Sequence, residues 1–350
     1  MEEHAALLGL VNVDGLGSFR IHKLLRHFGS ARAILATPYH DLVHAGVPAH
    51  IASNITQVAH HDHIGQWHHF HERGIHVIPF DDAHYPTLLS HIPNPPIMLF
   101  VRGSVTALNN PCVALVGTRH PSGYGIDVTR SIARDLVSHG VTVVSGLALG
   151  IDTIAHESAL HANGHTIAVL PSGVDLIYPE RNRALANRML TQPGSALVSE
   201  FFPGTKATPV LFPARNRLIS GLSLGVVVCE AGVQSGALIT VKAALDQGRD
   251  VMAVPGSVFA PHSAGCLELL HQGATPVRHA HDICAQLGLT ETPAALDTHD
   301  ELLRVLGSPR HIDELCRILA RSSADLLGDL LMRELRGEVR DIGNGCYVRC

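Results

Sequence analysis

Four glycine-rich turns in the middle of the chain are its most distinctive chemical feature. They begin at Gly117, Ser145, Pro171 and Ser235, and each comes soon after a short apolar run. Glycine-rich turns that lead into helices expose backbone amides and the positive end of the helix dipole, and both attract phosphate. We therefore expect a phosphate-binding surface formed by residues of these turns, namely Gly117, Thr118, Arg119, Gly123, Tyr124, Gly125, Ser145, Gly146, Gly173, Ser235, Gly236 and Thr240.

The turns depart from the common nucleotide-binding patterns. The first turn lacks the G-x-G-x-x-G spacing of dinucleotide binders, and the chain contains no G-x-x-x-x-G-K-[ST] sequence. The second apolar run ends in Ser145-Gly146, where an NAD enzyme would place a ribose-binding acid. The first turn instead carries Arg119, whose planar guanidinium can donate two hydrogen bonds to one phosphate.

A second basic segment, Phe212-Pro213-Ala214-Arg215-Asn216-Arg217, opens a predicted helix, with Pro213 in its first turn. Side chains two positions apart on a helix point about 200° apart. We therefore expect one of Arg215 and Arg217 to face a ligand, beside Asn216, and the other to pair with an acid. The sequence leaves open which arginine does which.

Three groups could serve a hydrolase. Asp152 and His156 stand four residues apart on one helix face, and Glu230 ends an apolar run. Alternatively Asp152 caps its helix, His156 bonds within the cluster of turns, and Glu230 accepts amides of a neighbouring loop. No nucleophile is evident beside Glu230, so we favour the structural roles and predict no catalytic residue.

Alternating elements must position these turns. Short apolar, valine-rich runs occur at 112–116, 141–144, 166–170, 196–198, 225–229 and 250–254, and stretches of helix length at 125–139, 152–163 and 236–247. This alternation predicts an α/β domain over 112–280, a Rossmann-like, doubly wound parallel sheet with helices on both faces. Ligands of such sheets bind beyond the carboxyl ends of the strands, where the turns lie.

Residues 1–80 are predicted to be helical. The turns Val13-Asp14-Gly15-Leu16-Gly17 and Ala45-Gly46-Val47-Pro48 resemble those of a helix-hairpin-helix, SAM-like module. Glycine lets the backbone turn tightly enough for amides to meet a phosphate, but the same pattern also builds a purely structural bundle. The histidines between His60 and His71 allow a metal-site hypothesis, although a histidine-rich helical surface is favoured and no metal is predicted.

The remaining segments are predicted to be connectors and one small domain. Proline-rich residues 81–111 indicate an extended strap, and 281–299 a flexible linker. Residues 300–350 combine three helical segments with two strands around Asn344-Gly345, which describes a winged helix. Asp325 and Asp329 on its third helix argue against duplex recognition, so we favour a protein-contact or scaffold role.

Composition limits the class of protein. The 350-residue chain has a formal net charge of −5, so a nucleic-acid site must be a local basic patch. Seven cysteines form no CxxC pair and suggest no disulfide framework. No apolar run reaches about 18 residues, and the first residues are acidic, so a cytoplasmic protein with no membrane association is expected.

The order of motifs resembles the DprA/Smf family over roughly residues 81–280. The motifs are Val116-Gly117-Thr118-Arg119, Val144-Ser145-Gly146-Leu147-Ala148, Gly150-Ile151-Asp152, Tyr178-Pro179, Ser199-Glu200, Phe212-Pro213 with Arg215-Asn216-Arg217, Glu230-Ala231 and Val254-Pro255-Gly256. The resemblance implies a homodimer that binds single-stranded DNA, protects incoming strands in natural transformation and helps to load RecA recombinase. It implies no enzymatic activity and no cofactor.

The resemblance also carries site residues over. Gly117-Thr118-Arg119 is implied as the main phosphate site, and Arg215-Asn216-Arg217 as a second part of it. Glu180 stands where a basic residue is expected, so affinity would depend instead on Arg181, Arg183 or Lys206. Tyr124 and Tyr178 are the candidates for base stacking.

Two other functions fit the same turns. A nucleotide-processing enzyme, such as a phosphoribohydrolase, would release a base or phosphate from mononucleotides, although fold alone does not establish that chemistry. A nucleotide-sensing scaffold would bind a mononucleotide and a partner protein. A recombination mediator would bind oligonucleotides with a steep salt dependence and leave them intact.

Overall fold

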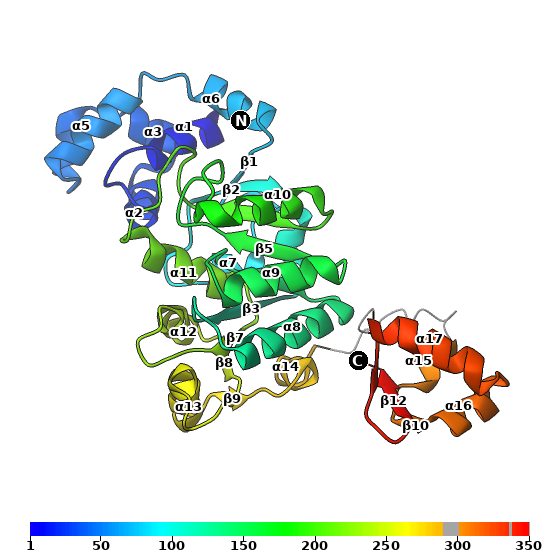
Figure 1. Cartoon of the computed structure of the whole chain (residues 1–350). Coiled ribbons are helices and arrows are strands. Elements are labelled where there is room, and N and C mark those ends of the chain that lie inside the picture. Colours follow the sequence, from blue (N-terminus) through cyan, green and yellow to red (C-terminus); the bar gives the residue numbers. More distant parts are fainter. Residues whose placement is uncertain (290–300, 336–337, 350) are drawn as a thin grey trace. The chain divides into compact units, whose positions relative to one another are not determined.

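A computed structural model describes residues 1–289, 301–335 and 338–349. Its contacts divide the chain into two compact units, Met1–Glu291 and Thr292–Cys350. The larger unit contains a sheet with nine described strands (Figure 1). They are β1 (His76–Pro79), β2 (Met98–Gly103), β3 (Cys112–Gly117), β4 (Thr142–Ser145), β5 (Thr166–Val169), β6 (Ala196–Ser199), β7 (Gly225–Glu230), β8 (Asp250–Ala253) and β9 (Thr275–Pro276).

The predicted parallel sheet is confirmed. Its strand order is β1-β2-β6-β5-β4-β3-β7-β8-β9, and every pair from β6 to β9 is parallel. All six apolar runs form strands, because continuously apolar residues can be buried on both faces at once. The chain extends the sheet in one direction from β3 to β6 and then restarts at β7 on the other side of β3. The topological switch point therefore lies between β3 and β7.

Helices cover both faces of the sheet, as a doubly wound fold requires. One face is covered by α8 (Gly123–Ser138), α9 (Ile151–His161), α10 (Arg183–Thr191) and α14 (Ala280–Gln286). The other is covered by α7 (Thr87–Ser90), α11 (Leu211–Gly221), α12 (Ala237–Asp246) and α13 (Ala264–His271). Along β3, Val113 and Leu115 pack on the first face, while Ala114 and Val116 pack on the second, as the period-2 geometry of a strand dictates.

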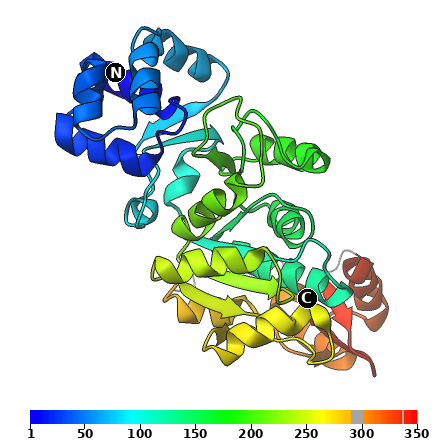
Figure 2. The ribbon, with the colours of Figure 1, turned by 90° about the vertical axis from the view of Figure 1, so that its left-hand side faces the viewer.

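The N-terminal residues form a helical module at one end of the sheet (Figure 2). Its helices are α1 (Glu2–Val11), α2 (Ser18–Phe28), α3 (Ala31–Ala36), α4 (Tyr39–His44), α5 (Ala49–Val58) and α6 (His63–Glu72). Their apolar side chains share one core with Met98 and Phe100 of β2. The predicted glycine turns join α1 to α2 and α4 to α5, and both Gly15 and Gly46 have positive φ, which glycine adopts without strain.

Three predicted boundaries are wrong. Residues 76–79 do not continue the helical region but form β1, and residues 81–111 are not an extended strap, since they include α7 and β2. β1 pairs with β2, and β2 with β6, both antiparallel. β2 contains no proline, so its amides can pair although prolines crowd the flanking segments. The predicted linker begins inside α14, and its part from 290 lies outside the described residues.

The smaller unit has the predicted three helices and hairpin. They are α15 (Glu301–Val305), α16 (Ile312–Leu319), α17 (Ser323–Leu335), β11 (Val339–Asp341) and β12 (Cys346–Arg349), with an additional short strand β10 (Arg310–His311) on β12. Their core includes Leu306, Leu315 and Leu330. Asp329 of α17 forms ion pairs with Arg321 and Arg333. In neither unit is a described helix long and apolar enough to cross a membrane.

Candidate nucleic-acid interface

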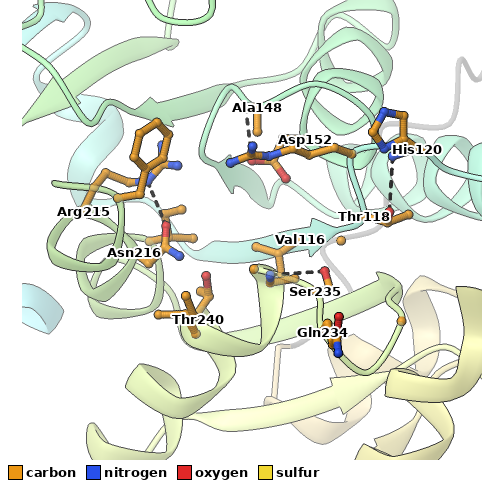
Figure 3. Close-up of a pocket in the computed structure, with 18 of the residues that line it drawn as sticks. Val116, Thr118, His120, Ala148, Asp152, Arg215, Asn216, Gln234, Ser235 and Thr240 are labelled. Carbon is orange, nitrogen blue, oxygen red and sulfur yellow. Dashed lines mark hydrogen bonds between the residues drawn. The ribbon is translucent and has the colours of Figure 1, made fainter. Parts of the chain in front are cut away.

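A pocket of about 520 Å³ opens at the topological switch point, and it is called the core pocket here. Its walls come from the turn after β3, the turn between β7 and α12, and α11. Figure 3 shows Arg215, Asn216 and Thr240 on one side and Thr118 and His120 on the other. The sheet topology thus brings together segments that are more than one hundred positions apart in the sequence.

Half of the predicted site residues line this pocket. They are Gly117, Thr118, Arg119, Arg215, Asn216, Ser235, Gly236 and Thr240. The other half do not line it: Gly123, Tyr124, Gly125, Ser145, Gly146, Gly173, Lys206 and Arg217. Three of the four predicted turns, those after β3, β4 and β7, therefore contribute to the pocket, whereas the turn after β5 contributes no lining residue.

Arg119 is the exposed cation of the core pocket. Among the described residues it forms no ion pair or hydrogen bond through its side chain, and its Cζ lies 5.8 Å from the centre of the Phe212 ring. Arg215 approaches the same ring at 5.9 Å. Tyr178 meets Phe212 edge-on at 5.7 Å between ring centroids. Two guanidinium groups and two aromatic rings therefore lie together, which suits both phosphate and base stacking.

The structure resolves the ambiguity between the two arginines of α11. Arg215 is 4% exposed, and it donates hydrogen bonds to the carbonyl oxygens of Gly146 and Val169, both at 2.5 Å. Burial lowers the pKa of Arg215 to about 10, so it stays charged near neutrality. Arg217 instead donates to the Glu200 carboxylate and to the carbonyl of Asn94. Arg215 is therefore the arginine of the pocket, and Arg217 is the one paired with an acid.

Asp152 and His156 have structural contacts, although not the predicted ones. The Asp152 carboxylate does not cap α9 but accepts the amides of Gly146 and Ala148, at 3.0 and 3.3 Å. The hydrogen bond of His156 is made to a strand residue, since its Nδ1 lies 2.6 Å from Oγ1 of Thr166 on β5. Burial lowers the pKa of His156 to about 3, so the imidazole is neutral. The two groups stabilise the turn after β4 and its strand neighbours.

Glu230 fastens the first turn. Its carboxylate accepts hydrogen bonds from the backbone amide and the hydroxyl of Ser122, at 2.8 and 2.5 Å. Gly125 lies against the same group, since a Cβ there would stand 2.4 Å from Oε2 of Glu230. The amide-bonding role that was predicted for Glu230 is thus the one observed. Gly125 is required for close packing, and it does not line the core pocket.

The other predicted residues outside the core pocket have varied positions. Ser145 is buried and donates to the carbonyl of Leu115, while Tyr124 is 51% exposed and donates to the carbonyl of Pro255. A Cβ on Gly173 would stand 2.8 Å from the carbonyl oxygen of Phe202. Lys206 is exposed. Of the basic residues near Glu180, Arg183 forms an exposed ion pair with it.

Several lining residues were absent from the predicted phosphate-binding surface, although Asp152 was considered as a hydrolase group. They are His120, Ala148, Asp152, Phe212, Gln234 and His262. Phe212 stands directly before Pro213 in the basic segment, so the motif could have predicted that it lies near the pocket. His262 lies outside all four turns, and no sequence signal connects it with them.

Of the six histidines from His60 to His71, four lie on α6 and two precede it. His63 is the buried member, and its Nε2 lies 2.9 Å from the carbonyl oxygen of Val58. Across the described part of the chain, no group of three or more histidine, cysteine or acidic side chains is placed to hold a metal ion.

Comparisons with known proteins agree with this architecture. The model of the family described as DNA recombination-mediator protein A matches residues 76–288. DNA processing protein DprA of Bacillus subtilis (strain 168) is 42% identical over 219 residues, which are 62% of this chain and 73% of the relative. Protein Smf of Escherichia coli (strain K12) is 40% identical over 290 residues, which are 78% and 77% of the two chains.

Two solved structures are also similar. The crystal structure of DprA from Streptococcus pneumoniae matches with a TM-score of 0.70 and 34% identity, covering 81% of this chain and 97% of that one. DNA processing protein A from Helicobacter pylori, whose structure describes a single-stranded DNA binding mode, matches with a TM-score of 0.53 and 32% identity, over 58% and 92%. The chain therefore belongs to the DNA recombination-mediator protein A family, in which it is similar to the DprA and Smf proteins.

Proposed function

We propose that this protein binds single-stranded DNA in the core pocket and acts in recombination without chemical turnover. The observation that carries the proposal is the unpaired, exposed Arg119 over the Phe212 ring, at the switch point of the sheet. A phosphate on the guanidinium and a base against the aromatic side chains would use both features at once. The single-stranded DNA binding of the Helicobacter pylori relative supports the same ligand.

The groups that a nucleotide hydrolase would need are engaged elsewhere. Asp152 accepts two turn amides, His156 is buried in its neutral form, and Glu230 is held by Ser122. A general base must reach the proton that it removes, and these three groups are occupied in holding the turns. The balance of observations favours binding over hydrolysis.

Calorimetry tests the proposed ligand against the alternatives. We expect tight binding of an oligothymidylate of about twenty nucleotides, weak or no binding of mononucleotides, and unchanged oligonucleotide afterwards. Release of a base or phosphate from mononucleotides would contradict the proposal in favour of an enzyme. Mononucleotide binding as tight as that of the oligonucleotide would favour a nucleotide sensor.

Family membership supports a cellular role in recombination. We propose that the protein protects incoming single strands in the cytoplasm and helps RecA to assemble on them. The measurement is the rate at which RecA assembles on strands already covered by a single-strand-binding protein. We expect addition of this protein to raise that rate, and an unchanged rate would contradict the role.

We also propose that the protein is a homodimer that pairs through α12 and α13. An apolar groove of about 250 Å³ lies between these helices, lined by Leu238, Val241 and Leu269. At its edge Val233 and Leu245 are 64% and 62% exposed. Exposed apolar side chains that cluster around a groove are typical of protein–protein contact surfaces, and a second copy is the occupant implied by the family.

A further inference from the structure

The N-terminal module carries a second cavity, which is separate from the core pocket. It has a volume of about 480 Å³ and lies where the two glycine turns meet α2, so it is called the α2 cavity here. Gly17 and Ser18 line it from the first turn and Gly46 from the second, together with Arg20 and Lys23 of α2. The two turns that resemble a helix-hairpin-helix module therefore form one continuous hollow.

The ionisable residues that line the α2 cavity are all basic. Arg20, Lys23 and His27 line it, and no described lining residue is acidic. These three positions are spaced by three and four residues, so their side chains lie on the same face of the helix. All three are exposed, while Ile21 and Leu24 are buried, and Leu24 also lines the α2 cavity. The helix thus packs its apolar face inward and presents a basic face to the cavity, in a protein whose overall charge is −5.

An aromatic ring and free amides complete this surface. Phe19 lines the α2 cavity and is 66% exposed, so its ring is accessible to a ligand. In the described structure, α2 begins after Gly17 with no side chain capping its first amides. Cations, an exposed ring and backbone donors in one hollow are the combination that binds single-stranded nucleic acid.

A third cavity lies beside the α2 cavity and extends to the start of α11. This middle cavity has a volume of about 570 Å³, and it shares Leu16, Gly17, Ser18 and Arg20 with the α2 cavity. At its other end it reaches Leu211, the first residue of α11, and the next residue, Phe212, lines the core pocket. Figure 1 shows α2 above α11 at this end of the sheet.

The middle cavity contains two acids, Asp14 and Glu200. The Glu200 carboxylate is only 9% exposed and forms an ion pair with Arg217, so its charge is compensated inside the protein. Exposed Lys206 directly follows Thr205, which lines the same cavity. Of the two acids, Glu200 is therefore balanced by Arg217, whereas Asp14 is exposed.

We propose that a single strand held in the core pocket continues through the middle cavity to the α2 cavity, where it meets Arg20, Lys23 and Phe19. This inference rests on the proposed function of the core pocket. It gives the N-terminal module a direct part in binding the strand, and it predicts two stages in the dependence of affinity on strand length. Short oligonucleotides fill the core pocket alone, and longer ones reach α2.

The test is fluorescence anisotropy with labelled oligothymidylates from about 6 to about 40 nucleotides, using the full chain. We expect Lys23→Glu to leave the affinity for the shortest oligonucleotides unchanged, and to weaken binding of the longest by about tenfold. The slope of log affinity against log salt should become shallower by about 0.7 for each phosphate that the protein no longer neutralises. Phe19→Ala should likewise weaken only the long oligonucleotides, by about fivefold or more.

Arg188→Glu is the matched control, because it makes the same change of charge on an exposed residue of α10 that lines none of the three cavities. An equal effect of Lys23→Glu and Arg188→Glu at every length would overturn the inference. Failure of the proposed core site is distinguishable, since Arg119→Ala would then change the affinity for no oligonucleotide. Lys23 and Phe19 are exposed, so thermal unfolding should show that both variants remain folded.

Discussion

Arg215 and Arg217 stand two residues apart on α11 and belong to different networks. Arg215 donates to the carbonyl of Gly146 behind the core pocket, and Arg217 donates to the buried carboxylate of Glu200. Their divergence follows from helix geometry, which points side chains at this spacing to nearly opposite sides. One helix therefore supplies both a wall of the pocket and an ion pair that ties α11 to the loop after β6.

Arg217 holds a buried ion pair, whereas Arg119 is exposed in the core pocket. Variants of the two residues should therefore differ, since the first should lose stability and the second should lose DNA binding. Arg217→Ala leaves the Glu200 carboxylate buried without its partner, and we expect a loss of about 3–5 kcal/mol in the free energy of unfolding. Urea denaturation measures that loss, and the double variant Arg217→Ala/Glu200→Gln should recover part of it. Arg119→Ala should unfold like the wild type. Unchanged stability of Arg217→Ala, with DNA binding abolished, would show instead that Arg217 contacts the strand.

The fit of Gly125 against Glu230 gives a second prediction. Gly125→Ala would place a methyl group 2.4 Å from Oε2 of Glu230, so the carboxylate must move away from Ser122. We expect a loss of about 1–3 kcal/mol in stability, typical of overpacking, and weaker binding of single strands as the first turn loosens.

Gly123→Ala is the matched control for this prediction. It lies on the same helix, and apart from its chain neighbours and the backbone of that helix no described atom stands within 4 Å of the added carbon. Its stability and DNA affinity should equal those of the wild type. If both alanine variants behaved alike in unfolding and binding measurements, Glu230 would have no part in holding the turn.

His156 predicts a dependence of stability on pH. Its folded-state pKa of about 3 lies below the ordinary value of 6.5, so the unfolded chain binds a proton that the folded protein does not. The contribution of neutral His156 is present above about pH 6.5 and is lost as the pH falls toward 3. Between about pH 7.5 and pH 5 this effect amounts to about 2 kcal/mol.

Chemical denaturation at the two pH values checks the prediction. The wild type should lose about 2 kcal/mol more than His156→Gln does, whatever the stability of the variant at neutral pH. His161→Gln, at an exposed position of the same helix, should show the wild-type loss. Equal pH dependence of the wild type and His156→Gln would contradict the burial of an uncharged imidazole.

The proposed dimer predicts the effect of a charge at its apolar groove. Leu245→Glu should convert the dimer to a monomer, because a carboxylate buried against a second copy would have no partner. Light scattering at several concentrations measures the mass. Val43→Glu, an exposed apolar residue of α4, is the control and should remain dimeric. A wild type that is monomeric at every concentration, or a Leu245→Glu dimer, would refute this interface.

The parallel sheet was predictable because its strands are continuous apolar runs between helices of ordinary length. β2 was not predicted, since prolines at 86, 93, 95 and 96 suggested an irregular strap, and β1 was not predicted because residues up to 80 were expected to be helical. A proline removes a backbone hydrogen-bond donor only at its own position. The proline-free segment from Met98 can therefore pair with β6. Local composition therefore identified the core of the fold but not its antiparallel edge.

The candidate site was predictable only in part, for a related reason. Strand topology places the turns after β3 and β7 side by side, so glycine-rich turns were a reliable signal for Thr118 and Ser235. Whether a residue faces the pocket or supports it depends on tertiary contacts, as Gly125 shows. His262 enters from a distant loop, which no spacing within the motifs could reveal.

The most direct test of the central claim is the salt dependence of oligothymidylate binding, measured by anisotropy for the wild type, Arg119→Ala and the control Arg188→Ala. Binding should prefer single strands over a duplex of equal length. Arg119→Ala should weaken it and make the log–log salt slope shallower by about 0.7 for each phosphate left without its cation. Arg188→Ala should match the wild type. Binding that is indifferent to Arg119, or absent, would contradict the assignment of the core pocket as the DNA site.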